Sequence, residues 1–288
     1  MRPGPTVELG VRAHDFGKLP VDELAARIGR KGFSCVQLAP TKALAGFDTD
    51  AGRLSPGFAG RVREAFQRRH IRIAVLGCYI NPVDSNVAQR GRQLARFKEY
   101  LRHARDFGCS VVGTETGSLN ADYSFHPGNR GEDTFQTLLA GVRELVAEAE
   151  TFGVFVGIEG VERYVISDPP RMKRLIDDVG SNHLQVIFDP VNLLSAGNHR
   201  RQDDIMKQAF ELFGDRIAIL HAKDFVVEEG RIRSALAGRG MLNYGLLAEL
   251  ITARKPGIDI LMEDTDPATV AAGARFLRSV FRAMAEKA

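Results

Sequence analysis

The chain of 288 residues has little of several features that define classes of protein. Its only three cysteines lie far apart and form no CxxC pair, so neither a disulfide framework nor a thiolate metal site is expected. No stretch approaches the roughly 18 apolar residues of a membrane helix, and the opening MRPGPTVELGV lacks the apolar segment of a signal peptide. These features predict a cytoplasmic protein with reduced thiols and no membrane partner.

Excess charge is also lacking. The net charge of +3 is small for this length, so it gives no reason to expect nucleic acid as a partner. The basic stretch 61–72 has Val62, Ala65 and Phe66 at helical spacing, which indicates the solvated face of an amphipathic helix. No GxGxxG turn follows the first two apolar runs, which disfavours a doubly wound dinucleotide-binding sheet.

What the chain does have is a repeated alternation of short apolar runs and helical patterns. The runs, rich in Val, Ile and Leu, span residues 7–11, 35–39, 73–80, 110–116, 154–161, 184–189, 217–222 and 259–264. Continuous apolar runs of this length are typical of strands buried on both faces of a parallel sheet. A strand followed by a helix, eight times, predicts a single (β/α)8 TIM barrel as one domain over residues 1–288.

Three of the helices can be bounded from their sequences. The apolar stripe of residues 134–151 ends before Gly153, which suits a C-terminal cap. A cap residue followed by proline at residues 168–169 predicts a second helix, which ends near Gly180. The last helix is predicted to begin in the same way at residues 266–267.

Four of the predicted strands end in a polar side chain. These are Glu159 after VGI, Asp189 after VIF, His221 after AIL and Glu263 after ILM. The carboxyl ends of TIM-barrel strands face one mouth, so the four should lie together. One such residue alone often caps a helix or pairs with a lysine, but three bare carboxylates in register would repel one another. The set therefore predicts a divalent cation, Mn²⁺ first, with Mg²⁺, Co²⁺ and Zn²⁺ as alternatives.

At these residues the sequence resembles the xylose isomerase-like barrels, the sugar phosphate isomerase/epimerase superfamily. The carriers are VGIEG, FDPVN, LHAKD and MED at the last four strands, with LGCYINP (76–82) and GRGMLNYGLL (238–247). The resemblance implies that Glu159, Asp189, His221 and Glu263 hold the metal. It also implies that Glu159 and Glu263 transfer protons.

The activity implied by the resemblance is a metal-dependent isomerase or epimerase that acts on a sugar or sugar phosphate. The cation would lower the cost of an enediolate, while one glutamate removes the proton α to a carbonyl and the other returns it. Return to the opposite face gives epimerisation, and return to the adjacent carbon gives isomerisation. The alternatives are an inosose dehydratase-like dehydratase of a cyclic polyol ketone, an apurinic-endonuclease-like phosphodiesterase and a non-catalytic sugar-binding barrel.

The chain departs from the family at Asn192, where many members carry a histidine. An asparagine can hydrogen-bond a hydroxyl but cannot shuttle protons at neutral pH. This weakens the assignment to the best-known ketose epimerases and counts against the endonucleases. It does not affect the four expected metal ligands.

Other residues are expected to contact a small sugar or polyol substrate. Lys223 lies on the same side of its strand as His221, and it would either bind substrate or pair with Asp224 or a barrel acid. Asn192, Glu115 and Asn81 are expected partners for sugar hydroxyls, with capping roles as the alternative. Glycines 238 and 240 would let the backbone approach a phosphate, although a flexible loop explains them equally well. A homo-oligomer is compatible with the sequence.

The long segment 117–133 is expected to form a lid over the mouth, because loops of this length are uncommon unless functional.

Overall fold

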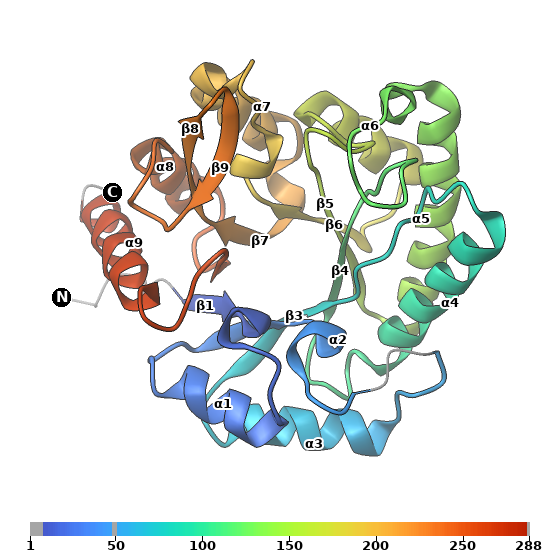
Figure 1. Ribbon diagram of the computed structural model, residues 1–288, viewed down its shortest axis with the longest axis horizontal. Helices are drawn as coiled ribbons and strands as arrows, with labels where there is room; N and C mark the ends of the chain where they lie inside the picture. Colours follow the sequence, from blue (N-terminus) through green and yellow to red (C-terminus); the bar gives the residue numbers. More distant parts are fainter. Residues whose placement is uncertain (1–7, 48–50, 287–288) are drawn as a thin grey trace.

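The computed structural model describes residues 8–47 and 51–286, and its centre is a closed barrel of parallel strands (Figure 1). The barrel strands are β1 Leu9–Arg12, β2 Cys35–Leu38, β3 Arg72–Gly77, β4 Val111–Glu115, β5 Phe155–Glu159, β6 Leu184–Phe188, β7 Ile217–Ala222 and β10 Asp259–Met262. Strand β1 pairs with both β2 and β10, which closes the barrel. The predicted single (β/α)8 barrel is confirmed.

Helices form a ring outside the strands (Figure 1). They are α1 Val21–Gly29, α2 Pro40–Ala43, α3 Pro56–Gln67, α4 Val87–His103, α5 Glu132–Phe152, α6 Pro169–Val179, α7 Gln202–Phe213, α8 Tyr244–Arg254 and α9 Val270–Ala285. Short 3-10 helices follow or precede several of them: η1 Ala13–Phe16, η2 Pro127–Arg130, η3 Val191–Leu193, η4 His199–Arg201 and η5 Gly214–Arg216.

The helix ends follow the capping chemistry of the sequence in two of the three predicted cases. Gly153 ends α5 in the left-handed region, and the Asp168 side chain accepts from the Arg171 N–H at the start of α6. The predicted start of the last helix at residues 266–267 is wrong. The Asp266 side chain accepts from the N–H groups of the two residues that precede Val270, and its backbone oxygen accepts from the Val270 N–H, so it caps a turn that leads into α9.

A small apolar cluster fills the barrel below its mouth. Its members are Cys35, Ala74, Val75, Val111, Ile187, Ile219 and Leu261. Two strand glycines make room for it: a Cβ on Gly113 would lie 2.7 Å from the Ile187 side chain, and one on Gly157 would lie 3.0 Å from it. The floor of the mouth is therefore apolar and closely packed, which raises the cost of any bare charge placed on it.

One element was not predicted, an antiparallel hairpin between β7 and α8. It consists of β8 Asp224–Glu228 and β9 Arg231–Ala235. Both turn residues, Glu229 and Gly230, have positive φ, as two-residue hairpin turns require. The sequence signal that would have indicated it is the apolar run Phe225, Val226 and Val227 followed by a turn that contains Gly230.

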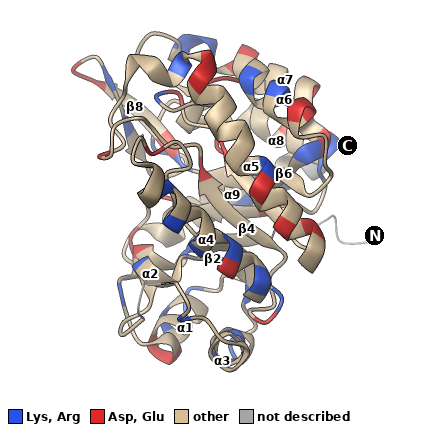
Figure 2. Cartoon of the chain, turned by 90° about the vertical axis from the view of Figure 1, so that its right-hand side faces the viewer, with Lys and Arg blue, Asp and Glu red and all other residues tan. Residues whose placement is uncertain are grey.

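Charged side chains of both signs are interspersed on the outer helices (Figure 2). Lys98 and Arg102 on α4 pair with Glu144 and Glu148 on α5, so the charges join neighbouring helices. Among the described residues, no helix is both long and apolar enough to span a membrane.

Candidate metal centre

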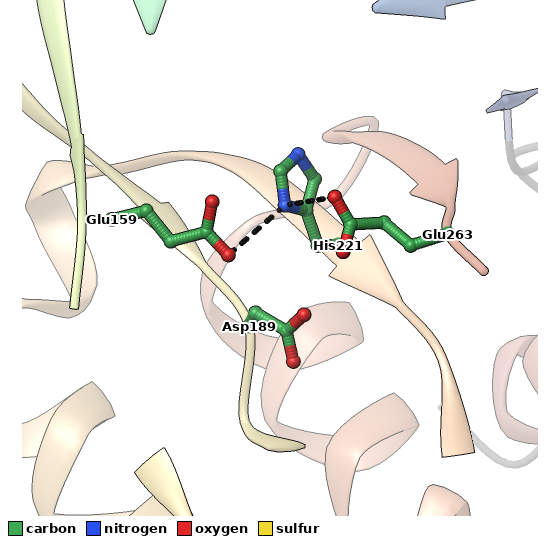
Figure 3. Close-up of side chains that lie close together, drawn as sticks. All are labelled: Glu159, Asp189, His221 and Glu263. Atoms are coloured by element: carbon green, nitrogen blue, oxygen red, sulfur yellow. Dashed lines mark hydrogen bonds and ion pairs between the residues drawn. The ribbon is translucent and has the colours of Figure 1, made fainter. Parts of the chain in front are cut away.

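Glu159, Asp189, His221 and Glu263 meet at the carboxyl ends of β5, β6, β7 and β10. One potential ligand atom from each lies within 4.8 Å of all the others. All four side chains are buried. Glu159 and Glu263 approach from opposite sides, with His221 between them and Asp189 beside all three (Figure 3). The register of the parallel strands thus brings together the four residues predicted from the sequence.

Asp189 is held by the turn that follows its strand. Its Oδ1 accepts from the backbone N–H groups of Val191, at 2.8 Å, and Asn192, at 3.2 Å, in the short helix η3. Its Oδ2 is buried and lies 2.9 Å from the Lys223 ammonium. One oxygen is therefore fixed by the backbone, while the other faces a side-chain cation whose charge a bound metal would replace.

The His221 ring presents its two nitrogens to different partners. Nδ1 lies 3.3 Å from Glu159 Oε1 and 3.1 Å from Glu263 Oε1, as the dashed lines in Figure 3 show. Nε2 lies 2.6 Å from Gln37 Oε1. The nitrogen that faces the acids is Nδ1, so this is the atom available to a metal.

The Lys223 ammonium lies among the carboxylates. It is 2.9 Å from Asp189 Oδ2 and 3.1 Å from Glu263 Oε2, and it donates to Asn192 Oδ1 at 2.8 Å. Asn192 Nδ2 in turn donates to Glu159 Oε1 at 2.6 Å. Of the alternatives for Lys223, the ion pair with barrel acids is found. Whether Lys223 or Asn192 also contacts substrate stays a prediction.

The protonation of the cluster follows from burial and opposing charge. Burial would lower the pKa of His221, but the charges of Glu263 and Glu159 outweigh it and raise that pKa to about 9. Burial raises the pKa of Asp189 to about 6, although the Lys223 charge opposes this. Burial would also raise the pKa of Glu263, but His221, Lys223 and Arg12 hold it below its usual range.

A divalent cation suits this set of donors. Three carboxylates and an imidazole form an oxygen-rich group of the kind that Mn²⁺ and Mg²⁺ prefer, and the Lys223 ammonium already places one positive charge beside Asp189 Oδ2. Protonated His221 and Lys223 supply the compensating positive charge within the chain itself. A bound cation would take over that role.

Arg12, at the end of β1, is a charged residue of the mouth that sequence reasoning missed. Its guanidinium lies 3.0 Å from Asp15, 2.6 Å from Asp264 and 3.5 Å from Glu263. Asp15 also accepts from the N–H of Thr265. The network ties β1 to the loop after β10, where the barrel closes, and it thereby restrains Glu263.

Two of the residues expected to contact substrate lie outside the cluster of four. Glu115 pairs in register with Glu159, and burial together with the charges of Glu159 and Glu263 raises its pKa to about 7. Asn81 is buried, donates to Ser118 O at 2.7 Å and accepts from the Ser118 N–H at 3.2 Å. Asn81 thus anchors the base of the predicted lid. Substrate contacts by either residue and movement of the lid stay predictions.

Asp224 organises the glycine-rich loop after the hairpin. Its carboxylate accepts from the backbone N–H groups of Phe225, Gly238 and Leu242 at 2.8 to 3.0 Å. A Cβ on Gly240 would lie 2.4 Å from the Asp224 carboxylate and 2.2 Å from a backbone oxygen. Gly240 is required for this close approach, so an internal carboxylate lies against the loop that the sequence offered for a phosphate.

Removing the Asp224 carboxylate should destabilise the fold. The change Asp224→Ala leaves three backbone N–H groups without their acceptor, at a cost of about 1–3 kcal/mol for each donor that stays buried. Phe225 and Leu242 are buried, so we expect the free energy of unfolding in urea to fall by about 2–6 kcal/mol. Asp122→Ala, which removes an exposed aspartate, is the control. Equal unfolding free energies for the two variants would contradict this role.

The fold and the site define a TIM-barrel protein with a candidate divalent-metal site in its mouth. The chain belongs to the xylose isomerase-like TIM barrel family, whose sequence profile matches residues 23–280. The family resemblance seen in the sequence is confirmed. A search of curated proteins finds no match.

Solved structures of similar fold include sugar epimerases. A D-tagatose 3-epimerase-like protein is 17% identical with a TM-score of 0.78, over 98% of this chain and 99% of that one. The 3-keto-D-glucoside 4-epimerase of E. coli is 17% identical with a TM-score of 0.71, over 95% and 99%. A Mycobacterium smegmatis barrel in complex with magnesium is 17% identical with a TM-score of 0.73, over 98% of both chains. At these identities the likeness concerns the fold.

Proposed function

We propose that the protein is a divalent-metal-dependent sugar isomerase or epimerase. The observation that carries the proposal is the buried convergence of Glu159, Asp189, His221 and Glu263 in the mouth. The similarity of the fold to sugar epimerases and to a magnesium-binding barrel supports it. These four residues would hold the cation.

A bound cation would polarise a substrate carbonyl and its neighbouring hydroxyl, and so stabilise the negative charge that develops when the α proton leaves. Glu159 and Glu263 face each other across the cluster (Figure 3). One carboxylate removes the α proton from one side of the substrate, and the other delivers a proton from the opposite side. Asn192 and Lys223 orient Glu159 and Glu263 through their hydrogen bonds.

The substrate is proposed to be a sugar without a phosphate at the end that faces the loop after β7. In TIM barrels a phosphate often binds at the loops after the last two strands. Here the Asp224 carboxylate already accepts from two backbone N–H groups of that loop, and a second anion beside this carboxylate would be repelled. We expect kcat/KM for a free ketose to exceed that for its phosphate by at least about tenfold, a difference of about 1.4 kcal/mol in transition-state binding.

Elemental analysis after incubation with Mn²⁺ and gel filtration tests the metal site. We expect about one metal per chain in the wild type and little in Asp189→Ala, because this change removes one of the three carboxylates that would hold the cation. Asp259→Ala is the matched control, since it removes a carboxylate of β10 at the other end of the barrel. No metal in the wild type, with no heat in a calorimetric titration, would contradict the proposal.

Product analysis separates the reaction classes. Wild-type protein loaded with metal should convert a ketose to an isomer of equal mass. A product lighter by one water would assign a dehydratase instead. Binding of sugar without any turnover across free ketoses and polyol ketones would contradict an enzymatic role.

A further inference from the structure

Gln37 reaches from β2 across the barrel to His221 on β7. The two strands are not neighbours, because β1 and β10 lie between them in the barrel. Both side chains are buried, and Gln37 Oε1 lies 2.6 Å from His221 Nε2. The contact therefore joins the candidate metal ligands to the opposite wall of the mouth.

The amide of Gln37 has a defined direction. In the structure its Nε2 donates to the hydroxyl oxygen of Tyr79, just after β3, and its Oε1 faces His221. An amide oxygen can only accept, and His221 Nε2 must therefore carry a proton. This arrangement leaves Nδ1, the nitrogen that faces Glu159 and Glu263, as the ligand atom of a neutral ring.

Tyr79 is itself held in place. The Lys42 ammonium lies 3.8 Å from the centre of its ring, and its backbone oxygen accepts from Arg96 at 2.8 Å. The pairing of β2 with β3 also shifts register directly before Gln37. Such irregularities are common beside functional sites, where they redirect side chains. The Tyr79–Gln37 pair is thus a fixed support for the imidazole.

We propose that Gln37, oriented by Tyr79, is a positioning residue that fixes the ring and tautomer of His221 for metal binding. The inference rests on the proposed function, because it assigns a role toward the same cation. Histidine ligands commonly donate their second N–H to such a partner, and loss of the partner lowers metal affinity about 10- to 100-fold. A buried glutamine that only fills the core would have no such effect.

The test is a calorimetric titration of Mn²⁺ into the wild type and three variants. Gln37→Leu removes the acceptor with little change in volume, and we expect Kd to rise about 10- to 100-fold. Gln37→Glu restores an acceptor, and its Kd should lie within about threefold of the wild type, since a carboxylate serves histidine ligands equally well. Gln185→Leu is the matched control, because Gln185 lies in β6 and bonds to Asn182 outside the cluster.

A second readout needs no metal. In long-range proton–nitrogen NMR spectra, the Nε2–H of His221 should be protected from exchange in the wild type and Gln37→Glu, and lost from view in Gln37→Leu. Equal Kd values for the wild type and Gln37→Leu would overturn the inference alone. An equal rise of Kd in Gln37→Leu and Gln185→Leu would also overturn it, because the change would then be a general effect on the fold. No metal binding by the wild type would overturn both the inference and the proposed function.

Discussion

Replacing either glutamate of the cluster by glutamine should abolish most of the activity. In Glu159→Gln and Glu263→Gln the side chain keeps its size and can still accept a hydrogen bond, but it cannot transfer a proton at neutral pH. We expect kcat to fall by about 10³-fold or more in each, because general acid–base catalysis contributes about 10²–10⁴-fold. Steady-state assays at saturating metal, with bound metal measured on the same samples, separate this loss from weaker metal binding.

Exchange of the α hydrogen with D2O makes this prediction sharper. If Glu159 and Glu263 act on opposite faces, each glutamine variant still removes the proton from one epimer. Glu159→Gln should then incorporate deuterium from solvent into one epimer, and Glu263→Gln into the other. Neither variant should convert one epimer to the other. Glu144→Gln, on the outer surface of α5, is the control and should behave as the wild type. Full turnover in Glu159→Gln would contradict its assigned role.

The convergence of the four polar strand ends could be predicted because parallel barrel strands share one register. Once each apolar run is identified as a strand, its terminal polar residue has only one place to lie. Glu159, Asp189, His221 and Glu263 all follow this rule. The first residue of a helix is harder to predict, as Asp266 shows, because a capping residue can also close a turn that precedes the helix.

The partners of the four residues could not be predicted, since they depend on contacts across the barrel. Gln37 interrupts an apolar run and was visible in the sequence, but nothing local indicates that it meets a histidine 184 positions away. Arg12 is similar, since its partner Asp264 lies 252 positions away. For Lys223 the sequence allows an ion pair with either Asp224 or a barrel acid. Only the structure shows that Asp224 is occupied by the glycine-rich loop.

The affinity for metal should fall steeply as pH falls, because ligands that are protonated in the metal-free protein must lose their protons to bind. A metal ligand must be deprotonated, whereas His221 has a pKa of about 9 in the metal-free protein and Asp189 has one of about 6. Below about pH 9, binding must displace one proton from His221, so affinity falls about tenfold for each unit of pH. Below about pH 6 the metal must also displace a proton from Asp189, so affinity falls about a hundredfold for each unit of pH.

Titration of Mn²⁺ at several pH values, each in buffers of different ionisation enthalpy, measures both the affinity and the protons released. We expect about one proton released per metal near pH 7.5 and up to about two near pH 5, with an overall loss of affinity of about 10³-fold or more between these values. Asp189→Asn, which retains a carbonyl oxygen but has no proton to lose, should bind more weakly and show one released proton throughout. If the affinity were independent of pH between 5 and 8, His221 would keep its proton when the metal binds. His221 would then not be a metal ligand.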